Sequence, residues 1–266
     1  MSTAGIGTAS TGFLKACCAD LWAQPGVRLL AGDALRPGGV ELTRWALDEL
    51  ALPEGSRVLD VGCGAGATLR LIQDLGLRPV GVDYSAALAT EAGAIGATAA
   101  GDAERLPLRS ATFDAVFIEC VLSAVPTKDL AAGELARVVT PGGAVVLSDV
   151  TLEGALPPPL ESFVGWIACA AGALSAGGYA ALLERAGLRI ERSDDHREAL
   201  TDLLAQARRR LALLQGAIGS DIVGTDGGGF AADAIDLGQT LLGLATEAVG
   251  AGTLGYALLI GRRPSR

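Results

Sequence analysis

Apolar and polar positions along the chain change period repeatedly, and these changes predict alternating strands and helices. Short apolar runs rich in Val and Ile are typical of buried strands, whereas apolar residues recurring every three or four positions indicate a helix face. Strands are expected at 57–61, 79–83, 97–101, 113–119, 144–149, 188–192 and 254–261, and helices at 66–74, 85–94, 128–138 and 177–186. Such alternation favours crossover helices joining parallel strands. The predicted fold class is α/β, with a doubly wound, mostly parallel seven-stranded sheet.

Further helical patterns lie outside this alternation. Apolar residues recur with helical spacing in 13–30 and 40–52, before the first strand, and in two runs within 195–250, before the last strand. We therefore expect residues 1–52 to form an N-terminal helical cap, and residues 53–266 to form the main domain with 195–250 as a helical insertion. The apolar stripes of the insertion need a surface to cover. They are expected to cover the substrate side of a cleft or to form the face of a homodimer.

Charge narrows the range of functions. The formal net charge is −9 and the isoelectric point is near 4.7, which argues against nucleic acid and anionic membrane surfaces as partners. Residues 162–183 carry no charge and are long enough to span a bilayer, but glycines interrupt the run and favour two shorter elements. The first ten residues lack the basic region of a signal peptide, so a cytosolic location is expected.

Acidic residues stand at or just beyond the carboxyl ends of the predicted strands. They are Asp60, Asp83, Asp102, Glu119 and Asp149. Ligands of doubly wound sheets bind at these strand ends. The sequence therefore predicts one polar cleft.

A glycine-rich turn follows the first predicted strand. Gly62, Gly64 and Gly66 allow a tight turn and a close ligand approach, and the next helix presents free N–H groups. Dinucleotide enzymes use a similar device, and a junction without any ligand is a further alternative. Asp60, two residues before the first glycine, suits a cationic amino-acid ligand better than a pyrophosphate, which it would repel.

This stretch resembles motif I, D/E-x-G-x-G-x-G, of the class I S-adenosylmethionine-dependent methyltransferases. The resemblance implies the Rossmann-like methyltransferase fold and S-adenosylmethionine as cofactor. It places Asp60, Gly62, Cys63 and Gly64 among the cofactor contacts. The Cys63 side chain occupies a small-residue slot and is expected to serve packing.

Two later segments extend the resemblance. Asp83 can accept hydrogen bonds from both ribose hydroxyls, and Tyr84 follows it among the expected cofactor contacts; the alternative is that Asp83 caps the next helix. Residues 101–108 resemble the family's "GDAE-x-LPF" segment. By that resemblance Asp102 accepts from the adenine amino group and the Ala103 N–H meets the ring. A nicotinamide cofactor would explain neither Asp60 nor the Asp102 segment.

Five cysteines and one histidine bear on the acceptor. The cysteines are Cys17, Cys18, Cys63, Cys120 and Cys169. An odd count in a reducing compartment does not indicate a disulfide framework, and a single histidine without a C-x-x-C pair disfavours a zinc site. Burial as small hydrophobic side chains is the simplest interpretation.

Three segments resemble the arsenite methyltransferases. They are Leu14–Cys18, Glu119–Leu122 with Pro126, Lys128 and Asp129 after it, and Ile167–Leu174. The resemblance implies that Cys120, Cys169 and Cys17 or Cys18 bind trivalent arsenic as thiolates above the transferred methyl, with thioredoxin or glutathione as reductant. Soft thiolates suit such a thiophilic centre. The lone pair of the arsenic would attack the methyl group without a general base.

Departures from that family leave alternatives open. Glu119 replaces the family's usual Asn, faces the methyl position by resemblance, and is the one plausible base for an oxygen or nitrogen acceptor. One alternative is a small-molecule O-, N- or C-methyltransferase of secondary metabolism or quinone type, with merely buried cysteines. The other is a cofactor-binding regulatory homologue without turnover.

Overall fold

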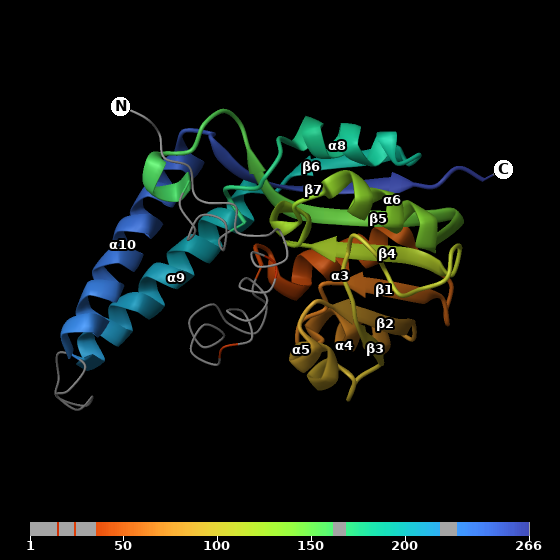
Figure 1. Ribbon diagram of the computed structural model, residues 1–266, viewed down its shortest axis with the longest axis horizontal. Coiled ribbons are helices and arrows are strands. Elements are labelled where there is room, and N and C mark those ends of the chain that lie inside the picture. Colours follow the sequence, from red (N-terminus) through yellow and green to blue (C-terminus); the bar gives the residue numbers. More distant parts are fainter. Residues whose placement is uncertain (1–14, 16–23, 25–35, 162–168, 219–227, 266) are drawn as a thin grey trace.

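A twisted seven-stranded sheet forms the centre of the molecule (Figure 1). The computed structural model describes residues 15, 24, 36–161, 169–218 and 228–265. The strands are β1 (Arg57–Val61), β2 (Arg78–Asp83), β3 (Ala97–Ala100), β4 (Phe113–Glu119), β5 (Val139–Leu152), β6 (Arg189–Asp195) and β7 (Leu254–Arg262). Their spatial order is β3-β2-β1-β4-β5-β7-β6. The order reverses between β1 and β4, which is where doubly wound sheets bind ligands.

The pairing confirms the predicted mostly parallel sheet. Strands β1 to β5 pair in parallel, whereas β7 runs antiparallel to both β5 and β6. The predicted strand boundaries depart most from the structure at β5, which begins at Val139 rather than at residue 144 and ends at Leu152 rather than at residue 149, and the register shifts between Phe113 and Ala115 on its partner. The glycine pair at 142–143 therefore forms an irregularity within a strand, with Gly142 at φ +81°.

Helices cover both faces of the sheet. They are α3 (Gly39–Leu50), α4 (Ala67–Asp74), α5 (Ala86–Ala92), α6 (Lys128–Val138), α8 (Ala176–Arg185), α9 (Arg197–Ile218) and α10 (Gly228–Gly250), with short 3₁₀ turns η1 (Leu122–Ala124) and η2 (Pro158–Glu161). Helices α6 and α8 share one buried cluster with β1, β4 and β5. Helices α3, α4, α9 and α10 contribute to the cluster on the opposite face.

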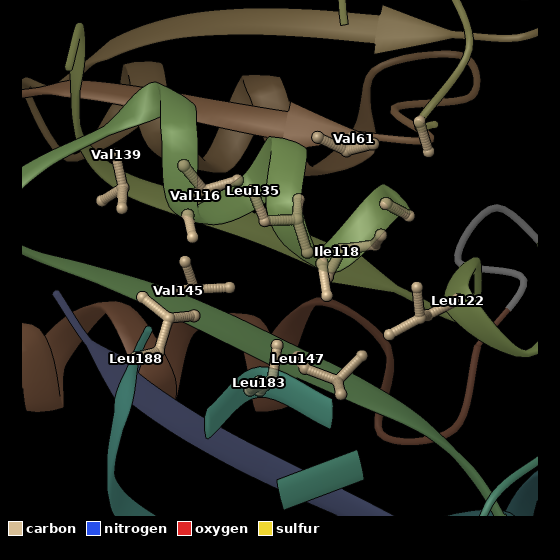
Figure 2. Close-up of a cluster of buried hydrophobic side chains, with 14 of the residues drawn as sticks. Val61, Val116, Ile118, Leu122, Leu135, Val139, Val145, Leu147, Leu183 and Leu188 are labelled. Atoms are coloured by element: carbon tan, nitrogen blue, oxygen red, sulfur yellow. The ribbon is translucent and has the colours of Figure 1, made fainter. Parts of the chain in front are cut away.

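The first cluster is almost entirely aliphatic, as Figure 2 shows. Val116, Ile118 and Leu147 project from the strands toward Leu135 of α6 and Leu183 of α8, and all five are fully buried. Runs of aliphatic residues of this kind are typical of parallel strands that are covered on both faces of the sheet. The close packing fixes the strand ends, and with them the acidic residues that follow.

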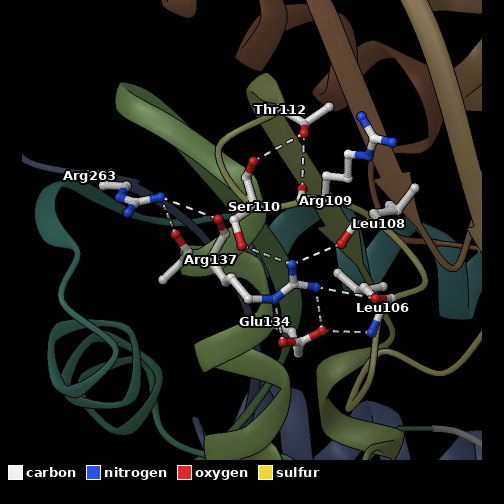
Figure 3. A network of polar contacts seen from close by, with 9 residues as sticks. Leu106, Leu108, Arg109, Ser110, Thr112, Glu134, Arg137 and Arg263 are labelled. Atoms are coloured by element: carbon white, nitrogen blue, oxygen red, sulfur yellow. Dashed lines mark hydrogen bonds and ion pairs between the residues drawn. The ribbon is translucent and has the colours of Figure 1, made fainter.

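A polar network ties the segment after β3 to α6 (Figure 3). The Arg137 guanidinium donates to the Leu108 carbonyl at 2.8 Å and pairs with Glu134. Glu134 in turn accepts from the Leu106 N–H at 2.7 Å. These contacts hold the loop that carries Asp102.

The insertion before β7 is a helical hairpin. Helices α9 and α10 contact each other and β7, and they extend away from the sheet in Figure 1. This confirms the expected helical insertion before the last strand. The expected helix at 13–30 and the cysteines at 17 and 18 lie outside the described residues, apart from Lys15, which is helical, and residue 24. None of the helices in the described part combines the length and apolar character of a membrane span.

Candidate functional site at the strand ends

The glycine turn after β1 has the backbone that its sequence requires. Gly62, Gly64 and Gly66 all adopt left-handed φ values, of +82°, +52° and +93°. A Cβ on Gly62 would lie 2.2 Å from Val121 Cγ2, whereas a Cβ on Gly64 would meet nothing within 4 Å. The first glycine therefore lets the segment after β4 pack against the turn. The second leaves open space above the loop.

Asp83 holds the turn from the end of β2. One carboxylate oxygen accepts from the Gly64 N–H and the other from the Ser85 N–H, both at 2.8 Å. The capping alternative is wrong, because Ser85 is the N-cap of α5 and its hydroxyl accepts from Leu88. Burial raises the pKa of Asp83, although both N–H bonds oppose this. Tyr84 beside it is exposed.

Asp60 is a buried carboxyl at the end of β1. Its side chain is almost completely enclosed. Burial, followed by the negative charge of Glu119, raises the pKa of Asp60 to about 8. Near neutral pH the free protein therefore holds Asp60 largely protonated. A cationic group placed beside it would favour the ionised form.

Glu119 is held by donors from two helices and the segment preceding them. Thr43 of α3 donates to Oε1 at 2.8 Å, and Thr68 of α4 donates to Oε2 at 3.1 Å. Arg36 forms an ion pair with Oε2 at 3.2 Å. The carboxylate thus joins the chain before α3 to the end of β4.

Arg36 keeps one donor unused. Its Nη2 donates to Thr43 and Thr68, at 2.7 and 2.8 Å, but its Nε is buried and has no hydrogen-bond partner among the residues that the structure describes. An unpaired buried donor costs free energy. A carboxylate is the natural partner for such a guanidinium.

Asp102 already has a cationic partner in this structure. The Lys15 ammonium lies 2.8 Å from both Asp102 carboxylate oxygens and 2.5 Å from Glu104. Ala103 between them is buried. The Lys15 side chain therefore reaches the segment that was expected to meet adenine.

Cys120 and Cys169 lie together beyond β4. The Cys169 thiol donates to the Cys120 carbonyl at 3.5 Å. Both residues adopt left-handed backbone conformations, with φ +53° and +62°, which are uncommon for non-glycine residues. The Cys120 Sγ also lies 3.5 Å from the Tyr256 hydroxyl. Burial raises the pKa of the Cys120 thiol.

Asp149, expected at a strand end, lies within β5, one residue after the Ser148 that pairs with the last residue of β4. It accepts from the Ser123 and Val150 N–H groups, both at 2.8 Å. Burial raises its pKa to about 6. Burial also lowers the pKa of Lys128, which donates to the Val125 carbonyl at 2.8 Å.

The structure thus gathers most of the expected residues at one edge of the sheet. Cys63 is the exception: its thiol is buried against Leu69 and Gly81, so residue 63 can contribute only its backbone to a ligand above the loop. Within the described residues, no group of three or more potential metal-ligating side chains occurs.

Sequence reasoning missed Arg36 and Tyr256. Only the isolated polar group of Tyr256 in an otherwise apolar strand could have signalled its role.

Comparison with known proteins agrees with this geometry. Residues 59–147 match the family model described as a methyltransferase domain. The chain is 36% identical over 143 residues to the demethylmenaquinone methyltransferase of Beutenbergia cavernae, covering 52% of this chain and 58% of that protein. It is 30% identical over 172 residues to the arsenite methyltransferase of Halobacterium salinarum, covering 57% and 43%. The chain therefore spans little more than half the length of the first of these relatives and less than half of the second.

Solved structures agree on the fold. The phosphoethanolamine N-methyltransferase 2 of Haemonchus contortus, solved with S-adenosyl-L-methionine, superimposes with a TM-score of 0.71 at 17% identity. The match covers 98% of this chain and 59% of that one.

Proposed function

We propose that this chain, whose residues 59–147 match a methyltransferase domain, is a class I S-adenosylmethionine-dependent methyltransferase and that it methylates a thiophilic acceptor, trivalent arsenic, held by cysteine thiols. The pairing of Cys120 with Cys169 carries the proposal. They come from segments 49 residues apart, yet the thiol of one contacts the backbone of the other. Two adjacent sulfur ligands suit a soft centre.

These thiols lie next to the cofactor loop. Val121 directly follows Cys120 and packs on Gly62 of the turn. An acceptor held by Cys120 would therefore stand close to a cofactor lying over that turn. Alignment of acceptor and methyl group is the main contribution that a protein makes to such a displacement.

The strand-end residues fit S-adenosylmethionine. The unpaired Arg36 Nε offers a buried donor for its carboxylate, and Asp60 offers a carboxyl for its ammonium. Asp83 would accept hydrogen bonds from the ribose hydroxyls. Asp102 would accept one from the adenine amino group once the Lys15 ammonium, which now donates to Asp102, has moved aside. When bound, the cofactor supplies an electrophilic methyl group on a sulfonium. The chain's own residues orient it and exclude water.

A trivalent arsenic centre has a lone pair, so this reaction requires no general base. Glu119, whose carboxylate already accepts from two threonine hydroxyls and pairs with Arg36, is therefore not needed to deprotonate the acceptor during methyl transfer. A thiol reductant, thioredoxin or glutathione, is the expected partner between turnovers.

A small-molecule O- or C-methyltransferase of quinone type is the second candidate function. The similarity to a demethylmenaquinone methyltransferase favours it. Asp149, with its pKa raised to about 6, would then be the available base, since a base is most effective when its pKa lies near the working pH.

A screen with labelled cofactor separates these functions. Arsenite, methylarsenite, selenite and phenolic acceptors are incubated with the wild type, Cys120→Ser and Cys169→Ser. We expect transfer to a trivalent arsenical in the wild type and its loss in both variants. Transfer only to phenolic acceptors, unaffected by either substitution, would establish the second function. Cofactor binding without turnover on any acceptor would indicate a regulatory homologue.

A further inference from the structure

A line of hydrogen-bonded side chains runs from the Cys120 thiol to the Glu119 carboxylate. The Cys120 Sγ lies 3.5 Å from the Tyr256 hydroxyl, and Tyr256 donates to Ser148 Oγ at 3.0 Å. Ser148 donates to Glu119 Oε1 at 3.5 Å. Tyr256, Ser148 and Glu119 are buried, and Cys120 is half-buried. Strands β4, β5 and β7 each contribute to this line.

The three hydrogen bonds of this line all run in the same direction, from donor to acceptor. Glu119 Oε1 accepts in its contact with Ser148, so the Ser148 hydroxyl proton points to Glu119. Tyr256 gives its own proton to Ser148. The Tyr256 oxygen then has only lone pairs to offer, and therefore Cys120 must be the donor in its contact with Tyr256. All three hydrogens point toward the carboxylate.

We propose that this line is the route by which Cys120 loses its proton when its sulfur bonds to a soft electrophile. The S–H bond breaks and its electron pair forms the new bond to the acceptor, while the group that the acceptor loses, hydroxide in the case of arsenite, departs with its own bonding pair. Tyr256 and Ser148 each receive one proton and pass one on, and Glu119 ends protonated. Tyr256 and Ser148 are thus positioning residues that act through Cys120. The proposal rests on the proposed function only in taking Cys120 as an acceptor-binding thiol.

The surroundings of Cys120 explain why such a route is useful. The thiolate, not the thiol, is the nucleophile, and burial holds the Cys120 thiol in its protonated form. The backbone keeps the sulfur in place, because the Cys120 N–H donates to the Ser148 carbonyl at 2.8 Å. The Cys120 thiol and the Tyr256 hydroxyl, the first proton acceptor, therefore stay next to each other while the bond forms.

Alkylation of Cys120 by iodoacetamide tests this route without cofactor or arsenic. Iodide leaves with the carbon–iodine electron pair, and the thiol proton must go elsewhere. The rate is followed by peptide mass spectrometry near neutral pH in the wild type, Tyr256→Phe and Ser148→Ala. Tyr179→Phe is the matched control, since its hydroxyl is also buried but donates to the Val150 carbonyl at 3.2 Å and not to Cys120.

We expect alkylation of Cys120 to slow by about tenfold in Tyr256→Phe and in Ser148→Ala, the factor that loss of one hydrogen bond produces. Tyr179→Phe should stay within about twofold of the wild type. Unchanged or faster alkylation in folded Tyr256→Phe would overturn the route, because the tyrosine would then merely shield the thiol. If Tyr256→Phe fails to fold, Ser148→Ala decides by the same criterion. The alkylation rates do not depend on whether the protein methylates any acceptor. A negative acceptor screen would therefore contradict the proposed function without contradicting the proton route.

Discussion

Binding of the cofactor should release a proton from Asp60. In the free protein the pKa of Asp60 is about 8, so the carboxyl is roughly nine-tenths protonated at about pH 7. An ammonium group at ~4–6 Å typically lowers a carboxyl pKa by about 1–3 units, that is, to roughly 5–7. The protonated fraction then falls to about one half or less. Between roughly 0.4 and 0.9 proton should therefore be released per cofactor bound.

Calorimetry with S-adenosylhomocysteine measures this number directly. The binding enthalpy is recorded in several buffers of different ionisation enthalpy, and its slope gives the protons released. The release should disappear near pH 9, where the free carboxyl is already ionised, and it should be absent in Asp60→Asn. A zero slope near pH 7, or the same slope in Asp60→Asn, would refute the assignment of Asp60 to the cofactor ammonium.

Three further outcomes follow from the contacts of the site and of the network beside it. Asp83→Ala removes the acceptor of two loop N–H groups as well as the ribose acceptor, and should weaken S-adenosylhomocysteine binding by about 1.5–3 kcal/mol; unchanged affinity in calorimetry would exclude the ribose role. Arg36→Met removes the unpaired buried donor and should weaken the same binding at least about tenfold, whereas an unaltered dissociation constant would place the cofactor carboxylate elsewhere. The hydrogen bond from Arg137 lowers the pKa of Glu134, so its stabilisation is present above the ordinary carboxyl range and is lost as pH falls through the lowered pKa. Thermal unfolding should therefore show a stability gap between wild type and Glu134→Gln at neutral pH that closes in acid, and a gap that persists in acid would contradict this sign.

The sheet and the strand-end acids could be predicted because they depend on local patterns. Ala115–Ile118 is a short apolar run, and Val58–Val61 is apolar apart from Asp60; such runs are typical of strands in a sheet that is covered on both faces. The spacing of Asp60 from the glycines fixes its position at the end of β1. The start of β5 at Val139 could not be predicted, because Pro and Gly at 141–143 normally indicate a turn.

The remaining parts of the site depend on contacts between distant segments. Arg36 lies in a loop-like stretch with no periodicity, and its partner Glu119 is 83 positions later in the chain. The hydroxyl of Tyr256 is the one polar side-chain group in an otherwise apolar stretch, but its partners become known only when β7 is placed beside β5. Antiparallel pairing that aligns Tyr256 with Val150 brings its hydroxyl to Ser148. No local pattern encodes that register.

The central claim is that Cys120 and Cys169 together hold the acceptor. Arsenic K-edge absorption spectroscopy of the protein loaded with arsenite in thiol-free buffer counts the sulfur atoms bound to arsenic. The wild type should show at least two sulfur neighbours, and Cys120→Ser and Cys169→Ser should each show one fewer. Arsenic surrounded by oxygen alone in the wild type, or a sulfur count in both variants that is unchanged from the wild type, would contradict the claim.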